Sequence, residues 1–306
     1  MKYFTLYSLV IMACLFILAC EDVIDPKLEK ADPIMTVDAW LVSKPGEQLI
    51  QLTWSVAYDD NDEYPPGVKG ATVSVLDNEG KMYEFIEDSQ KINGTYVWKP
   101  VGSEVFGKIG NTYTLTINYN GETFSATSKI NPVPAVDSIA FEYVNDDPMF
   151  AEGYRAEFWG NDLTGEGNTY WIKTYKNGTL LNKPSEINIA YDAGISTNTQ
   201  NDGKVFLPPI RLAINPNDVD DNDKRLPAYR SGDSVYVEIN SITLSAYNYL
   251  NEVITNTNRQ TGVGSLFSTA MSNVSTNVTN NDTKGSPVVG FFNTAAASGK
   301  GKKFVK

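Results

Sequence analysis

The sequence contains no histidine among its 306 residues. Without an imidazole, Ser-His-Asp and Cys-His catalysis are excluded, and the side chain that most often binds transition metals is missing. A glycan hydrolase needs only two carboxylates, but no spacing singles out a pair among the 37 acidic residues. We therefore expect a protein that is not an enzyme and has no cofactor and no metal site. A carboxylate-dependent glycan hydrolase is the less favoured alternative.

Cysteine is almost as scarce, since Cys14 and Cys20 are the only two. Cys14 lies within an uncharged, apolar run from Tyr3 to Leu18 that follows Lys2, a pattern typical of a secretory signal peptide. A membrane span needs about 20 apolar residues, and this run is shorter. With the signal peptide removed, no disulfide can form, so the exported fold must be held together by apolar burial.

The end of the apolar run resembles the lipobox of bacterial lipoproteins. Ile17 stands three residues before Cys20, and the small residue Ala19 directly precedes it. By this resemblance residues 1–19 are a signal peptide, and Cys20 becomes the first mature residue and carries acyl chains. Several such chains give a stable anchor, at about 0.8 kcal/mol for each buried methylene. The charged residues 20–32 then form a tether, and a plain secretory signal cut nearby is the alternative.

Excess positive charge is also absent, because the formal net charge is −12. Nucleic acids and anionic headgroups bind clustered Lys and Arg, so an acidic surface repels them. We expect no nucleic-acid partner. The lysines at the end of the chain read as a solvated or frayed strand end; they are Lys300, Lys302, Lys303 and Lys306.

Apolar and polar residues alternate through the first half of the chain, as in half-buried strands. The predicted strands are 34–42, 47–57, 68–76, 81–86, 95–98, 112–119 and 122–130. Asn120-Gly121 predicts a tight hairpin, and Tyr113 after Gly110 resembles a tyrosine corner. No helical pattern interrupts these strands. The fold class is therefore mainly β, with an immunoglobulin-like β-sandwich over residues 33–131.

Asn131-Pro132-Val133-Pro134 predicts a domain boundary, because prolines favour extended backbone. Further strands are predicted at 137–143, 154–159, 169–175, 179–181, 205–214, 234–242 and 288–292, with a hairpin at Asn177-Gly178. A helix capped by Thr243 or Ser245 should run to about residue 256, with another helical turn near 266–271. Residues 135–306 should thus form a second β-rich domain with short helices around 243–272.

Two groups of residues are candidate sites. The aromatic residues Trp159, Tyr170, Trp171 and Tyr175 lie on two predicted strands, where flat rings can stack on a ligand. Packing within the core explains most of them, and Trp159 and Trp171 are kept as ligand-facing candidates. The run Asp218–Asp223 has the alternating oxygen ligands of a calcium loop. However, Asp223 replaces the expected glycine and Tyr229 the expected glutamate, which favours a solvated loop.

Several stretches occur in an order that resembles a lipoprotein family, the domain of unknown function 4249 (DUF4249). They include Val37-Asp38-Ala39-Trp40-Leu41, Val68-Lys69-Gly70-Ala71-Thr72-Val73, Asp137-Ser138-Ile139 and Gly290-Phe291-Phe292. The resemblance implies a lipid-anchored protein of the outer membrane of Bacteroidota, exposed at the cell surface. It further implies an accessory role beside a TonB-dependent receptor in nutrient capture or uptake. A structural or adhesive surface lipoprotein is the alternative.

Overall fold

Alternating burial builds the strands of the first half. In β1 (Met35–Ser43) the side chains of Met35, Val37, Ala39 and Leu41 are buried, whereas Asp38 between them is exposed. The other strands of this half are β2 (Gln48–Trp54), β3 (Thr72–Asp77), β4 (Met82–Glu87), β5 (Thr95–Trp98), β6 (Thr112–Tyr119) and β7 (Glu122–Lys129). All seven predicted strands are therefore confirmed.

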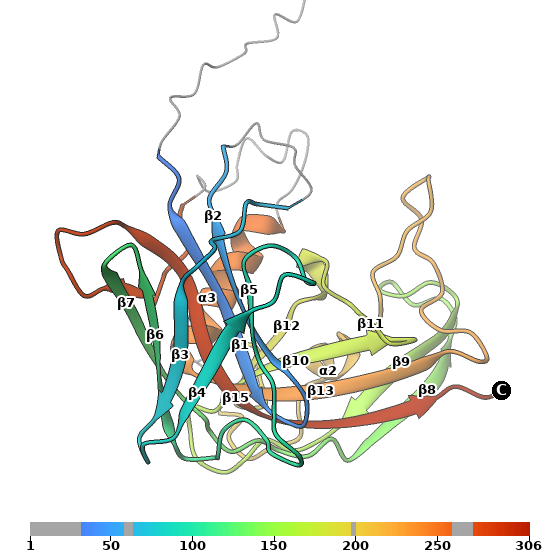
Figure 1. Cartoon of the computed structure of the whole chain (residues 1–306). Helices are drawn as coiled ribbons and strands as arrows, with labels where there is room; N and C mark the ends of the chain where they lie inside the picture. The colour runs from blue at the N-terminus through green and yellow to red at the C-terminus, as the bar shows by residue number, and fades with distance from the viewer. Residues whose placement is uncertain (1–31, 58–63, 197–199, 259–271) are drawn as a thin grey trace, which may run out of the picture. The chain divides into compact units, whose positions relative to one another are not determined.

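The computed structural model describes residues 32–57, 64–196, 200–258 and 272–306 (Figure 1). The second half contains the strands β8 (Ser138–Val144), β9 (Gly153–Trp159), β10 (Thr169–Lys176), β11 (Thr179–Leu180), β12 (Asn188–Tyr191), β13 (Ser234–Ile242), β14 (Thr279–Asn280) and β15 (Val288–Lys303). Its helices are η1 (Pro184–Glu186), α2 (Pro208–Leu212) and α3 (Leu244–Thr257). The predicted signal peptide, Cys20 and the helical turn near 266–271 lie outside the described residues.

Thirteen strands join in one mixed sheet of order β11-β10-β13-β15-β1-β2-β5-β4-β3-β6-β7-β14, with β12 paired to β10. The last strand, β15, lies in the middle, parallel to β1 and antiparallel to β13 (Figure 1). Strands β8 and β9 form a separate two-stranded sheet. The prediction of a mainly β protein is thus confirmed, and the strands of the first half enclose a core in a sandwich-like way.

Strand β15 also links the two halves through their cores. Phe292 and Ala296 from β15 are buried in the first core, beside residues of β1 to β7. Phe304, just after β15, is buried in the second core, beside residues of β8, β9, β10 and β13. Residues 33–306 form one compact unit by their contacts. The predicted division at residues 131–135 stays a prediction. The last strand and the residue after it nevertheless contribute side chains to the cores of both halves.

The two Asn-Gly hairpins and the tyrosine corner predicted from the sequence are present in the structure. Asn120 and Gly121 have φ of 49° and 82°, and Asn177 and Gly178 have 52° and 84°, as a tight hairpin requires. The Tyr113 hydroxyl accepts a hydrogen bond from the Lys108 amide at 2.7 Å, which closes the predicted tyrosine corner.

The helices and the chain end show two agreements with the predictions and one difference. Thr243 caps α3 by accepting from the Ala246 amide, as predicted. The predicted strand at 205–214 is wrong, because two prolines open α2 there, at positions whose N–H groups a helix leaves free. Lys300, Lys302 and Lys303 are exposed at the end of β15, as predicted for a solvated strand end. Lys300 and Lys302 also donate to the carbonyl oxygens of Asp137 and Ile139.

No helix among the described residues is long and apolar enough to cross a membrane.

Replacing Gly290 by alanine should disrupt the pairing of β15 with β1. Gly290 has φ of +109°, and an added Cβ would lie 2.0 Å from the Val37 carbonyl oxygen. Strain and overlap together should lower the free energy of unfolding by roughly 3 kcal/mol or more in chemical denaturation. Gly301→Ala in the same strand is the matched control, since its Cβ meets nothing nearer than 3.4 Å. Equal stability of the two variants would contradict this account.

A fragment of residues 33–131 should not fold alone. Its core would lose Phe292 and Ala296, and the edge of β1 would lose nine paired residues of β15. We expect poorly dispersed amide signals in a two-dimensional NMR spectrum of the fragment. A well-dispersed spectrum would instead support an independent first domain.

Candidate functional site

One face of the central sheet carries aromatic and charged side chains. The residues of β1, β15, β13 and β10 alternate between the two cores and this opposite face, which α3 partly covers through Ala246, Tyr247 and Leu250. We call this surface the α3 face. It comprises Asp38, Trp40, Trp171, Lys173, Glu238, Asn240, Tyr249, Phe291 and Asn293.

Four aromatic rings are in contact on the α3 face. The Trp40 ring lies 5.1 Å from that of Trp171 in an edge-on arrangement and 5.7 Å from that of Phe291 in a stacked one. Tyr249 from α3 lies 4.6 Å from Phe291 between ring centres. Phe291 is buried, whereas the other three rings are half-buried. Three large rings therefore keep accessible surface on which a planar or apolar group can pack.

Charged groups border these rings. The Lys173 ammonium lies 4.0 Å from the centre of the Trp171 ring, a cation–π contact. The buried Glu238 carboxylate is bound by Lys44 at 2.7 Å and by the Asn240 side-chain amide at 3.2 Å. Lys173 and Asp38, by contrast, have no ion-pair partner within 4.0 Å in the part of the chain that the structure describes.

Both unpaired groups have shifted pKa values. Burial lowers the pKa of Lys173 from 10.5 to about 8; the positive charge of Lys44 adds to this shift, whereas Glu238 and Asp38 oppose it. Loss of hydration also raises the pKa of Asp38, although Lys173 and the Trp40 side chain oppose that shift. The Asp38 side chain is nevertheless exposed to solvent, whereas Lys173 is half-buried. The protein thus disfavours the charged form of both groups, and such perturbed groups are typical of functional sites.

The structure separates the two tryptophans singled out from the sequence. Trp171 belongs to the α3 face. Trp159 lies on β9, where the Arg211 guanidinium covers its ring at 3.7 Å and pairs with Glu157 at 3.1 Å. Trp159 therefore has a cationic partner of its own and is not brought together with Trp171.

The run Asp218–Asp223 is organised by its own backbone. Asp220 accepts hydrogen bonds from the amides of Asn222 and Lys224, which lowers its pKa, and Asp218 is bound by Lys183 at 2.6 Å. These contacts engage one side-chain oxygen each of Asp218 and Asp220 and fit the solvated-loop interpretation.

A different set of carboxylates comes together near the second core. Oxygens of Asp162, Asp192 and Asp202 lie within 4.8 Å of one another, and the first two residues are buried. Each carboxylate accepts backbone amides of nearby loops, and Asp162 also accepts from the Tyr170 hydroxyl at 2.5 Å. The three side chains therefore hold loops together, which accounts for their proximity.

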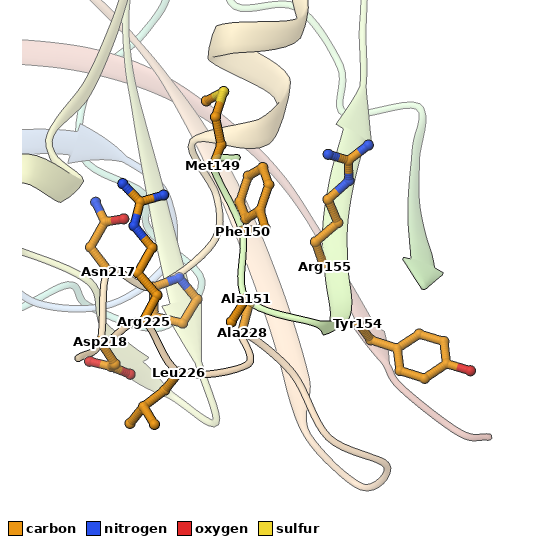
Figure 2. A pocket seen from close by; sticks show the side chains of 11 residues that line it. Met149, Phe150, Ala151, Tyr154, Arg155, Asn217, Asp218, Arg225, Leu226 and Ala228 are labelled. Atoms are coloured by element: carbon orange, nitrogen blue, oxygen red, sulfur yellow. The ribbon is translucent and has the colours of Figure 1, made fainter. Parts of the chain in front are cut away.

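Two hollows lie elsewhere on the surface. Figure 2 shows a pocket with Phe150 between the side chains of Arg225 and Arg155; its free space is about 20 Å³, room for one water molecule. An open cleft of about 470 Å³ lies over β4 and β5, with Ile86 and Val97 among its lining residues and Glu84 and Asp88 beside them. The first has room for no more than a water molecule, and Trp98, the aromatic residue that lines the second, is buried. The α3 face is therefore the strongest candidate.

The comparison with protein families agrees with the resemblance noted in the sequence. The model of a family described as Domain of unknown function (DUF4249) matches residues 21–300. The chain belongs to the DUF4249 family. No curated protein matches the sequence. The matched range includes every residue of the α3 face in this DUF4249 protein.

Sequence reasoning found Trp171 but missed its charged neighbours. Period-two alternation places Trp171 and Lys173 on one face of β10, and Asp38 and Trp40 on one face of β1. That signal was present in the sequence. Side chains of β10 and β1 share one surface because β13 and β15 pair with them and lie between them. The sequence of β10 or β1 alone does not reveal these pairings.

The Lys173 amine should titrate near pH 8, which NMR of the lysine side chains can follow. Glu238→Gln should lower this pKa further and Lys44→Met should raise it, because these charges act on Lys173 in opposite directions. In the unfolded chain Lys173 keeps its proton up to about pH 10.5, whereas in the folded protein it loses the proton near pH 8. The contribution of Lys173 therefore makes the free energy of unfolding rise between pH 8 and 10.5. Lys173→Met should remove that slope, and an unchanged pKa in both charge variants would contradict the electrostatic account.

Proposed function

We propose that this DUF4249 protein is a lipid-anchored binding protein of the outer membrane, exposed at the cell surface, that captures a nutrient without chemical conversion. The α3 face is the observation that supports ligand capture. It combines half-buried rings with two opposite charges that lack ion-pair partners, and these groups come from β1, β10 and α3. Such a mixture of apolar area and a few polar groups is typical of small-molecule sites.

The N-terminal sequence supports the anchor. Cys20 follows an apolar signal segment in a lipobox-like context, and the family match begins at residue 21, directly after it. Acyl chains on Cys20 would hold the domain beside the bilayer. A lipid-anchored capture protein must pass its ligand to a transporter, and a TonB-dependent receptor of the outer membrane is the partner that the family resemblance implies.

The anchor and the partner are tested together by a Cys20→Ala variant expressed in the native bacterium. We expect the parent protein to incorporate labelled fatty acid, to sediment with outer membranes and to co-purify with a TonB-dependent receptor. The variant should lose the label and the sedimentation, since Cys20 is the only site for acyl chains in the proposal. Equal membrane retention of both proteins would refute the anchor. Recovery of no transporter with the parent protein, together with unchanged nutrient uptake after gene deletion, would favour the structural or adhesive alternative.

A further inference from the structure

Two opposite charges on the α3 face remain without ion-pair partners. Lys173 and Asp38 lie on the same face of the sheet, on β10 and β1, and each affects the pKa of the other. Yet neither forms an ion pair within 4.0 Å with another described residue. Lys173 is half-buried, and burying a charge without a partner costs free energy that a ligand of opposite charge recovers. Asp38 is exposed, so a ligand can reach its carboxylate. The α3 face therefore offers one site for an anionic group and one for a cationic group.

Two buried amides beside the tryptophans also have unused hydrogen-bonding atoms. Asn240 is the cross-strand neighbour of Trp171, and Asn293 is that of Trp40. Both asparagines are 1% exposed, and neither the Asn240 Oδ1 acceptor nor the Asn293 Nδ2 donor has a partner. Buried polar groups are nearly always paired in folded proteins. A free acceptor and a free donor thus lie next to the same rings as the unpaired charges.

The rings define the apolar part of the site. Trp40, Trp171 and Tyr249 are half-buried and in contact through ring centres 5.1 Å and 6.0 Å apart. Aromatic groups pack favourably on one another in edge-on and offset arrangements. A neutral sugar could also stack here, but its hydroxyl groups would leave Lys173 and Asp38 without counter-charges.

We propose that the α3 face binds a zwitterionic amino acid with an aromatic side chain. Its carboxylate pairs with the Lys173 ammonium, its ammonium group pairs with the Asp38 carboxylate, and its ring packs against Trp40, Trp171 and Tyr249. The inference rests on the proposed role of the α3 face in ligand capture, but it does not depend on the lipid anchor or on the transporter.

The test uses ligands that differ by one charge. L-Phenylalanine carries both charges, L-phenylalaninamide lacks the carboxylate, and N-acetyl-L-phenylalanine lacks the ammonium group. Titration calorimetry with the full chain in detergent should show binding of L-phenylalanine, and each derivative should bind about tenfold more weakly or worse. Methyl glucoside, which has no charge, should not bind.

Protein variants assign each ligand charge to its residue. In Lys173→Met, L-phenylalanine should bind as weakly as the amide binds to the parent protein, whereas Lys173→Arg should restore much of the affinity. In Asp38→Asn, the affinity should fall to that of the N-acetyl derivative for the parent protein. Removing both a ligand charge and its protein partner should weaken binding no more than removing either one, because the two changes delete the same interaction. Thermal unfolding of each variant checks that the fold is kept.

Three results would overturn the proposal. They are equal binding of all three phenylalanine ligands, no binding of L-phenylalanine at millimolar concentration to folded protein, and unchanged affinity in both charge variants. If methyl glucoside binds and Trp171→Ala weakens this binding, the proposal of a zwitterionic ligand is wrong, whereas ligand capture at the α3 face still holds. The anchoring experiment on Cys20 is independent of all these outcomes.

Discussion

The parallel pairing of β15 with β1 is the constraint on which the rest of the structure depends. It joins residues 288–296 to residues 35–43, so the first and last strands of the described fold lie side by side. Parallel strands so far apart in sequence pair only at a large cost in loop closure, and the buried side chains of β15 must offset it. Gly290 makes the close approach feasible because any side chain there would meet the Val37 backbone.

The central place of β15 shapes both the cores and the α3 face. Its even-numbered residues Phe292 and Ala296 are buried in the first core, while Phe291 and Ala295 point to the helix side. Ala295, also on the helix side, is buried in the same cluster as Phe291. Trp40 and Trp171 come from strands on either side of β15 and meet there at 5.1 Å. One strand thus determines both the packing and the position of the aromatic rings.

The sequence predicted the features that depend on near neighbours. The seven strands of the first half, two Asn-Gly hairpins, the Tyr113 corner and the Thr243 cap each follow from a few consecutive residues. The prediction of a strand at 205–214 was wrong because Pro208 and Pro209 begin a helix there, and proline is common at the start of a helix as well as beside a strand. The place of β15 and the position of Lys173 and Asp38 on one face depend on pairings between strands distant in the sequence, which periodicity within one segment cannot reveal. The aromatic residue Trp171 of the site was accordingly predicted from the sequence, and the charged residues Lys173 and Asp38 were not.

The unpaired charges of the α3 face have no evident role in stability. Trp40 packs on Phe291 and Trp171 through ring contacts that would persist with a neutral residue at position 173. Glu238 already has Lys44 and Asn240 as partners, so Lys173 is not needed to satisfy it. Loss of hydration instead shifts the pKa values of half-buried Lys173 and exposed Asp38 toward their neutral forms. At half-buried position 173 a fold selected for stability alone gains more from an apolar side chain, and for this reason Lys173 and Asp38 are best understood through what they bind.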